Sequence, residues 1–331
     1  MRNLPPPDAA NGVPFTVADF VEAGRERLRL KVLVGGKGLE RVIEEPVLYR
    51  PGLALTGFFK DFAFRRVQLF GNAEMSYVKA LPEETRSEPF KGLLAHKARL
   101  FVYTNSNVPT PGSDILALAK AAGAAVLQSS LSTRQFSRLA TFILERLGAP
   151  RTSIYGTMVE VCGLGVMFEG DPGMGKSETA LGLIKRGAAL IADDLTCIRK
   201  DVGTDLLFGS ASEATAGYME LRGIGIMHVP SVFGINAVRG EKRLQLVITF
   251  KRLSDVVGEI DRIGQTRRTR EILGVKVPNI IIPVSEGRDL VNLVETAAQQ
   301  QKLINAGHDP VADLSERLHR RAGNAGDREG I

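Results

Sequence analysis

The chain has 331 residues, of which 44% are hydrophobic and 24% charged, and its formal net charge is +6. This composition is typical of a globular protein, and the length predicts two domains that each bury a core. No apolar run is long enough to span a membrane and the first residues do not resemble a signal peptide, so we expect a cytoplasmic protein. The modest charge suits phosphate ligands, whereas the absence of Trp and the presence of only five Tyr argue against a nucleic-acid-binding module.

The first half of the chain predicts an α/β domain. Thr16 and Asp19 form a capping pattern at the start of one helix, and Ser132 caps a long amphipathic helix that follows it. Between these helices, apolar runs alternate with helical patterns. Strands are expected at residues 30–34, 67–70, 100–103 and 124–127, and helices at residues 114–122 and 133–147.

A boundary between two domains is predicted at Gly148-Ala149-Pro150, which ends the long helix. We therefore expect an amino-terminal regulatory or assembly domain over residues 1–148 and a catalytic domain over residues 149–321. The first has no visible catalytic constellation, and its lone His96 is interpreted as an ordinary surface residue. Residues 322–331 are polar and glycine-bearing, so we expect a disordered tail there.

A phosphate-binding loop follows the apolar run at residues 166–168 and precedes a helix expected over residues 176–186. The loop consists of Gly170, Asp171, Pro172, Gly173, Met174, Gly175, Lys176 and Ser177. Its glycines let backbone N–H groups turn toward one anion, Lys176 can reach the outer phosphates, and the Ser177 hydroxyl can bind Mg²⁺. The helix adds its positive amino-terminal end, so the sequence predicts a nucleotide-phosphate site.

Two carboxylates, Asp193 and Asp194, follow the strand expected at residues 188–192. Neighbouring strand residues point to opposite sides, so one carboxylate can lie near a metal ion and the other near an acceptor hydroxyl. A pair of solvated turn aspartates is the alternative. Their position, one crossover after a phosphate loop, favours the functional interpretation.

Charged residues are embedded in the otherwise apolar run at residues 218–227. Glu220 could complete the Mg²⁺ shell, and Arg222 could neutralise charge on the transferring group. A salt bridge at a strand edge is the alternative. Arginines also lie close to glycines farther along the chain, at Arg239, Arg262 and Arg288.

Taken in order, these motifs resemble the bacterial HPr kinase/phosphorylase family. Besides the loop, the resemblance rests on Ala192-Asp193-Asp194, Glu220-Leu221-Arg222-Gly223-Ile224-Gly225-Ile226, Ala237-Val238-Arg239-Gly240, Pro283-Val284 with Gly287-Arg288, and Arg50-Pro51-Gly52-Leu53-Ala54-Leu55-Thr56-Gly57. It implies an amino-terminal α/β domain followed by a phosphoenolpyruvate-carboxykinase-like P-loop kinase domain. It also implies a homohexamer that transfers phosphate from ATP, or from pyrophosphate, to a serine of the carrier protein HPr.

The resemblance assigns a role to each matching residue. Lys176 would hold the β and γ phosphates, while Ser177 and Glu220 would hold Mg²⁺. Asp194 would be the base that takes the serine proton, and the acid in the reverse reaction. Asp193 would support the metal or the base.

Two departures from the family pattern bear on the direction of the reaction. The family has an active-site histidine-glycine pair where this chain has Tyr155-Gly156, and usually a basic residue where Ser285 stands. A phenol titrates near pH ~10 and cannot carry a proton as an imidazole does at neutral pH. By the same resemblance Arg262 is a catalytic arginine, and residues 283–288 act mainly in phosphorolysis. We therefore expect weak phosphorolysis.

Two other functions remain open at this point. One is a kinase on the same scaffold that acts on another protein or on a small hydroxyl compound. The other is a nucleotide-sensing hexamer with poor turnover, for which Tyr155 would be the sign. Retention of Asp193, Asp194, Glu220 and Arg262 argues against the sensor.

Overall fold

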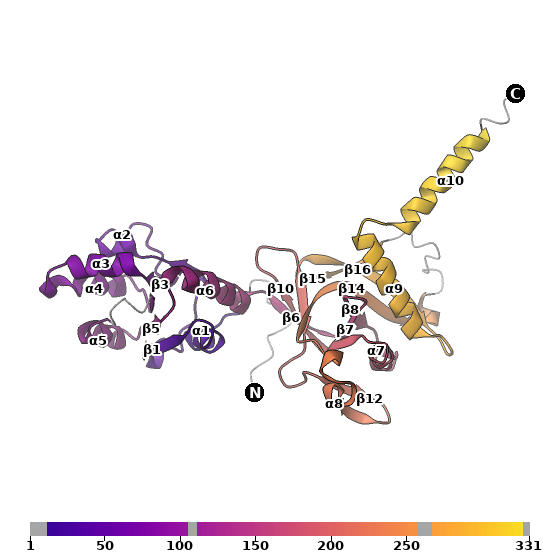
Figure 1. Cartoon of the computed structure of the whole chain (residues 1–331), viewed down its shortest axis with the longest axis horizontal. Helices are drawn as coiled ribbons and strands as arrows, with labels where there is room; N and C mark the ends of the chain where they lie inside the picture. The colour runs from indigo at the N-terminus through magenta and orange to yellow at the C-terminus, as the bar shows by residue number, and fades with distance from the viewer. Residues whose placement is uncertain (1–11, 105–110, 257–266, 327–331) are drawn as a thin grey trace. The chain divides into compact units, whose positions relative to one another are not determined.

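The computed structural model describes residues 12–104, 111–256 and 267–326 (Figure 1). Contacts divide the chain into two compact units, one from Asn11 to Ala149 and one from Pro150 onward. No helix in the described part of the chain is both long and apolar enough to cross a membrane.

The first unit is built on a five-stranded sheet with the order β1-β5-β4-β3-β2. Its strands are β1 (Leu30–Val34), β2 (Leu48–Tyr49), β3 (Val67–Phe70), β4 (Leu100–Thr104) and β5 (Ala125–Ser129). The last four run parallel, and β1 pairs with β5 in the antiparallel sense. The predicted strands of this half are confirmed.

Helices cover both faces of this sheet, so its strands β3, β4 and β5 are buried on both sides. One core contains Phe101 of β4 with residues of the helices α2 to α5, and the other contains Val102 with residues of α1 and α6. These helices are α1 (Val17–Gly24), α2 (Gly52–Leu55), α3 (Asn72–Ala80), α4 (Glu88–Ala95), α5 (Ser113–Ala121) and α6 (Thr133–Gly148), with short 3₁₀ turns at Gly36–Gly38 and Glu83–Thr85.

The helix caps predicted from the sequence are present. Thr16 and Asp19 form a reciprocal capping box at the start of α1. The Ser132 hydroxyl accepts a hydrogen bond from the backbone N–H of Gln135 at the start of α6. Each cap satisfies N–H groups that the first helical turn leaves without a partner.

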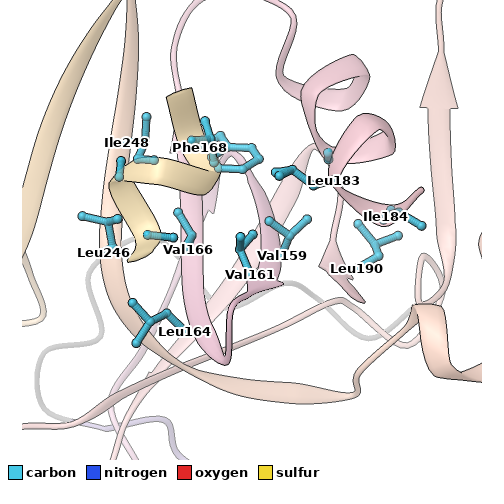
Figure 2. Packing of buried hydrophobic residues seen from close by; sticks show 14 of the residues in the cluster. Val159, Val161, Leu164, Val166, Phe168, Leu183, Ile184, Leu190, Leu246 and Ile248 are labelled. Carbon is cyan, nitrogen blue, oxygen red and sulfur yellow. The ribbon is translucent and has the colours of Figure 1, made fainter. Parts of the chain in front are cut away.

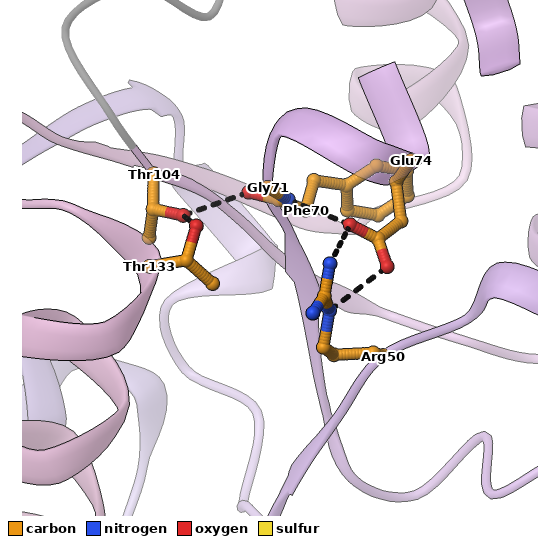
Figure 3. A network of polar contacts seen from close by, with 6 residues as sticks. All are labelled: Arg50, Phe70, Gly71, Glu74, Thr104 and Thr133. Atoms are coloured by element: carbon orange, nitrogen blue, oxygen red, sulfur yellow. Dashed lines mark hydrogen bonds and ion pairs between the residues drawn. The ribbon is translucent and has the colours of Figure 1, made fainter. Parts of the chain in front are cut away.

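A polar network ties β3, β4 and α3 together at the carboxyl ends of the parallel strands (Figure 3). The Arg50 guanidinium donates two hydrogen bonds to the buried Glu74 carboxylate, at 2.9 and 2.8 Å. The Glu74 carboxylate also accepts the backbone N–H of Gly71 at 3.0 Å. Thr104 and Thr133 share a hydroxyl hydrogen bond of 2.8 Å beside it. Arg50 belongs to the motif that resembles the family's amino-terminal domain, and its role here is structural.

The second unit contains a nine-stranded sheet and a separate hairpin. The main order is β6-β10-β11-β14-β8-β7-β9, and β16 pairs with β14 and β15. The sheet consists of β6 (Arg151–Tyr155), β7 (Thr157–Val161), β8 (Leu164–Glu169), β9 (Ala189–Ala192), β10 (Leu195–Lys200), β11 (Leu207–Ser210), β14 (Glu241–Arg252), β15 (Thr269–Ile272) and β16 (Val275–Val284). The hairpin consists of β12 (Tyr218–Leu221) and β13 (Gly225–His228).

The helix after the phosphate loop packs on this sheet. Phe168 of β8, Leu183 of α7 and Ile248 of β14 meet in one buried cluster (Figure 2). The helices of the unit are α7 (Lys176–Ile184), α8 (Val229–Phe233), α9 (Leu290–Asn305) and α10 (Pro310–Gly326), with 3₁₀ turns at Ile235–Ala237 and Leu253–Val256. The apolar face of α7 thereby fixes the orientation of its amino-terminal end.

Strand directions gather several loops at one edge of this sheet. The strands β8, β14 and β16 are parallel, so their carboxyl ends lie at the same edge. Because β7 is antiparallel to both β8 and β9, β9 points the same way as β8. The segments that follow β8, β9 and β16 are therefore neighbours, as ligand-binding segments are in open α/β sheets.

The ends of α7 and α10 differ from the sequence-based expectation. The helix after the phosphate loop ends at Ile184, two residues before the predicted end. At the carboxyl end, α10 continues to Gly326, into the segment expected to be disordered. The first turns of α10 are amphipathic. Because extending a formed helix is easier than starting one, the helix continues past residue 322, where the sequence becomes polar.

Candidate active site

The phosphate loop is shaped by three glycines. Gly170, Gly173 and Gly175 have φ angles of 148°, 86° and 83°, a region that other residues rarely adopt. The helix α7 begins at Lys176, immediately after the loop. The Lys176 ammonium lies in the curl of the loop, where it donates to the carbonyl oxygens of Gly170 at 2.7 Å and Asp171 at 3.1 Å. An amino-terminal helix end and an ammonium group thus converge on one place, as a phosphate site requires.

Asp193 is the centre of the polar contacts at the end of β9. Its Oδ1 accepts hydrogen bonds from the hydroxyls of Thr157 at 2.7 Å and Ser177 at 3.0 Å. Its Oδ2 accepts the backbone N–H of Glu220 at 3.1 Å. Burial raises the pKa of Asp193 and the Asp194 charge adds to this, while the three hydrogen bonds act in the opposite direction. A buried carboxylate held in this way is stabilised by a nearby cation.

The oxygen donors around Asp193 fit a magnesium ion. Mg²⁺ prefers hydroxyl and carboxylate oxygens, and it commonly uses one or two carboxylates together with substrate phosphates. Ser177, Asp193 and the exposed Glu220 offer such donors. No group of three His, Cys, Asp or Glu among the described residues would hold a metal by itself. A magnesium ion held by these donors would take further oxygen ligands from a nucleotide phosphate.

Asp194 is exposed and adopts a φ of 59°, which is unusual for a residue other than glycine. Its carbonyl oxygen accepts the backbone N–H of Gly156 at 2.8 Å, and Leu195 pairs with Tyr155 in the β6–β10 ladder. Tyr155 is 83% exposed. Asp194 and Tyr155 are thus neighbours at the same corner of the site, and the strained backbone directs one carboxylate outward while Asp193 points inward.

Gly156 allows the chain to pass close to β8. A Cβ placed there would lie 2.6 Å from the carbonyl oxygen of Phe168, which is closer than any side chain tolerates. The glycine of the Tyr155-Gly156 pair is therefore required by packing, whatever residue precedes it.

Arg222 lies against the phosphate loop. It follows β12, and a Cβ placed on Gly173 would be 3.2 Å from a terminal nitrogen of its guanidinium. Glu220 and Arg222 are both exposed. Their segment contacts Asp193 through the Glu220 backbone and the phosphate loop through the Arg222 guanidinium. This placement favours the functional interpretation of the two charges over a salt bridge at a strand edge.

Arg239 lies elsewhere in the unit. Its guanidinium pairs with the Glu160 carboxylate at 3.4 Å, and Lys242 pairs with the same carboxylate at 3.1 Å. Glu160 is opposite Ala189, the first residue of β9, whereas Asp193 follows the last. Within this chain, Arg239 is therefore at the other end of the strands from the phosphate loop.

Of the two remaining arginines, Arg288 and Arg262, the structure describes only Arg288. Arg288 is exposed in the segment after β16. Two residues later, a Leu290 methyl group lies 3.5 Å from where a Cβ on Gly175 would be, so this segment is beside the loop. Arg262 lies outside the described residues.

Comparisons with known proteins cover both units of the chain. The HPr serine kinase amino-terminal model matches residues 15–144, and the HPr serine kinase carboxyl-terminal model matches residues 146–318. The chain belongs to the HPr kinase/phosphorylase family. The predicted family, the α/β fold class and the assignment to a kinase/phosphorylase enzyme class are confirmed.

Several relatives of this family match nearly the whole chain. The HPr kinase/phosphorylase of Leptospira biflexa is 37% identical over 308 residues, which cover 93% of this chain and 95% of the relative. That of Listeria monocytogenes is 37% identical over 300 residues, covering 91% and 95%. A solved structure, the Hpr(Ser) kinase/phosphatase from Coxiella burnetii, is 32% identical and covers 50% of this chain and 98% of its own, with a TM-score of 0.45.

Thr157 is a site residue that the sequence reasoning missed. It is fully buried and holds the Asp193 carboxylate from the first position of β7. The only signal in the sequence is a lone hydroxyl at the start of an apolar strand. Its contact with Asp193 depends on the register of β7 and β9, which the sequence does not reveal.

Proposed function

We propose that this protein transfers the γ-phosphoryl group of ATP to a serine of HPr, with Mg²⁺ as the required metal. The observation that carries the proposal is the cluster of Ser177, Asp193 and the Glu220 backbone beside the phosphate loop, with Asp194 at its edge. It is supported by relatives named HPr kinase/phosphorylase that are 37% identical over nearly the whole chain.

The residues of the loop bind and orient the donor. The backbone N–H groups and Lys176 hold the phosphates, and Arg222 supplies a second positive charge at the loop. When bound, Mg²⁺ neutralises charge on the β and γ phosphate oxygens, and Ser177, Asp193 and Glu220 would hold it. Thr157 keeps the Asp193 carboxylate in place.

The Asp194 carboxylate acts as the general base for the acceptor serine. Its carboxylate takes the proton of the serine hydroxyl as the serine oxygen bonds to the γ phosphorus and the bond to the ADP oxygen breaks. In the reverse direction phosphate attacks phosphoserine, the protonated Asp194 returns the proton to the serine oxygen, and pyrophosphate leaves. The exposed position of Asp194 allows a protein serine to reach it.

Assembly as a homohexamer is part of the proposal and is supported by family resemblance. Exposed apolar side chains on and around β13, including Ile224 at 75% and Ile226 at 77% exposure, are also consistent with a covered surface. Light scattering at micromolar concentration tests it. A mass near that of the 35.8 kDa chain would contradict the hexamer.

The function is tested by incubating the purified protein with γ-labelled ATP, Mg²⁺ and purified HPr. We expect label on a serine of HPr, and none on an HPr variant that lacks this serine. Nucleotide binding without labelling of HPr would overturn the proposal. Label on a different acceptor would instead support the kinase on the same scaffold.

A further inference from the structure

A cavity in the first unit lies apart from the phosphate loop. Its volume is about 390 Å³, which is within the range of pockets that hold small organic ligands. It is lined by Val17, Arg41, Val42, Ile43, Glu44, Phe64, Arg65, Arg66, Val67, Lys97, Arg99 and Leu100. All of these belong to the unit from Asn11 to Ala149.

The fold constructs the walls of this cavity from well-anchored segments. Val67 begins β3 and Leu100 begins β4, so the cavity opens at the amino ends of these parallel strands. The segment that follows β1 is fastened to the start of α1 by backbone hydrogen bonds between Val17 and Arg41 and between Ile43 and Phe15, both 2.9 Å. The Arg50–Glu74 network lies at the opposite ends of the strands.

The charge of the lining is strongly positive. Five of the twelve lining residues are Arg or Lys, and one is acidic. Two of the cations already have partners: Arg65 pairs with Glu44 at 3.2 Å, and Arg66 pairs with Glu45 at 2.8 Å.

The other three cations, Arg41, Lys97 and Arg99, have no carboxylate partner among the residues that the structure describes. Two of them are held in place by backbone carbonyls. Nε of Arg41 donates to the carbonyl oxygen of Gly123 at 2.8 Å, and Arg99 donates to those of Leu94 and Ala98 at 2.7 and 2.8 Å. Burial, together with the Arg41 charge, lowers the pKa of Arg99 from its ordinary value. Arg41 and Arg99 therefore repel each other, and no carboxylate among the described residues neutralises them.

The rest of the lining is apolar. Val17, Ile43, Val67 and Leu100 are buried and form an aliphatic wall, and Phe64 adds an aromatic ring. Inorganic anions would leave this wall without a partner, and a neutral apolar compound would leave the charges unpaired.

From this juxtaposition we propose that the cavity is a second ligand site, which binds a small organic phosphate carrying an apolar group. The phosphate contacts Arg41, Lys97 and Arg99, and the apolar group lies against Phe64 and the aliphatic wall. Arginine guanidinium groups suit phosphate because they offer paired donors in one plane. The site is independent of the proposed kinase reaction.

Phenyl phosphate is a suitable probe because it joins a dianionic phosphate to an aromatic ring. We would titrate it into the full chain by calorimetry at low salt, with inorganic phosphate and phenol as separate probes. We expect phenyl phosphate to bind more tightly than either one, with an affinity that falls as salt is raised. Equal affinity for phenyl phosphate and inorganic phosphate would contradict the role of the apolar wall.

Variants distinguish this cavity from the phosphate loop. The double variant Arg41→Gln/Lys97→Gln should weaken phenyl phosphate binding about tenfold or more, which corresponds to about 1.4 kcal/mol. The matched control Arg27→Gln/Lys120→Gln removes the same charges from exposed positions outside the cavity and should bind as the wild type does. Lys176→Ala changes the phosphate loop and should leave the binding of phenyl phosphate to this cavity intact.

A further variant covers the case in which loss of the Arg41–Gly123 hydrogen bond unfolds the first unit. Lys97→Glu reverses a charge whose ammonium makes no hydrogen bond within the described ranges, and it should weaken binding as the double variant does. If Lys176→Ala abolishes binding of phenyl phosphate while the cavity variants retain it, the second site is refuted.

Discussion

The Ser177 hydroxyl lies 3.0 Å from the Asp193 carboxylate, which links the first turn of α7 to the end of β9. The two residues belong to different walls of the site, and each would be an oxygen ligand of Mg²⁺. Because Thr157 and the Glu220 backbone hold the same carboxylate, its position is fixed before any ligand arrives. Such preorganisation lowers the cost of assembling the site around nucleotide and metal.

Asp194→Asn should leave ATP binding almost unchanged and lower the transfer rate by about 10² to 10⁴. The carboxylate is exposed at the edge of the site, where it can take the acceptor proton, and among the described residues it makes no hydrogen bond to the loop. Binding of a fluorescent ATP analogue and labelling of HPr measure the two effects separately. The control Asp205→Asn changes an exposed aspartate of the same unit. Wild-type turnover in Asp194→Asn would remove the assignment of the base.

Lys176→Ala should abolish nucleotide-dependent phosphorylation. Its ammonium lies in the curl of the loop, 2.7 Å from the Gly170 carbonyl oxygen, where it can contact phosphates in both the ground and transition states. Lys185→Ala removes an exposed lysine at the other end of α7 and serves as the matched control. Measurable labelling of HPr by Lys176→Ala would show that the loop does not act as proposed.

Arg222→Met should lower kcat by about 10² to 10³, as loss of one charged donor at a developing negative charge does. The guanidinium is beside Gly173 and therefore near the bound phosphates. Steady-state kinetics with HPr and ATP test this, and Arg222→Lys should recover only part of the loss because it lacks the planar fork of donors. Unchanged kcat in Arg222→Met would mean that the residue contacts neither phosphate nor acceptor.

Local rules account for what the sequence predicted well. The loop pattern, the helix caps and the strand ends depend on residues close together in the chain, and Gly170, Thr16 and Asp193 lie where these rules put them. The Thr157–Asp193 contact depends instead on the register of β7 and β9. Arg239 shows the same limit, because an arginine beside a glycine does not reveal which end of a strand it faces, and it pairs with Glu160.

Glu74→Gln should destabilise the first unit by about 1 to 3 kcal/mol, the cost of disturbing a buried charged hydrogen-bond group. Burial acts to raise the pKa of Glu74, but the hydrogen bonds and charge of Arg50, together with the Gly71 N–H, outweigh it and hold the pKa below its ordinary value. The stabilisation is therefore present above the pKa of the unfolded chain, and it is lost as pH falls through the lower pKa of the folded protein.

Denaturant unfolding between pH 7 and pH 3 measures this linkage. The difference in stability between the wild type and Glu74→Gln should shrink as the solution becomes more acidic, because the protonated carboxyl group resembles the amide. Glu83→Gln, on the exposed 3₁₀ turn Glu83–Thr85, should match the wild type at every pH. A difference that stays constant down to pH 3 would contradict the lowered pKa.

The direction of the reaction provides the last prediction. Phosphorolysis requires phosphate to approach phosphoserine, so two anions that repel each other must be screened. Tyr155 is 83% exposed beside Asp194 and carries no positive charge, and Ser285 is an uncharged residue after β16. Lys176, Ser177 and Asp194, to which we assign roles in the forward reaction, are all present. We expect this protein to favour the kinase direction, with weak release of pyrophosphate from phospho-HPr.

Tyr155→His is the informative change, because an imidazole can be protonated near neutral pH and a phenol cannot become positive. With phospho-HPr and millimolar phosphate, this variant should release pyrophosphate faster than the wild type, and more so toward pH 6. Tyr155→Phe keeps the ring but adds no charge, so it should show no such gain. If the wild type already releases pyrophosphate at a rate comparable to its kinase rate, Arg262 and Arg288 supply enough charge and the predicted bias is wrong.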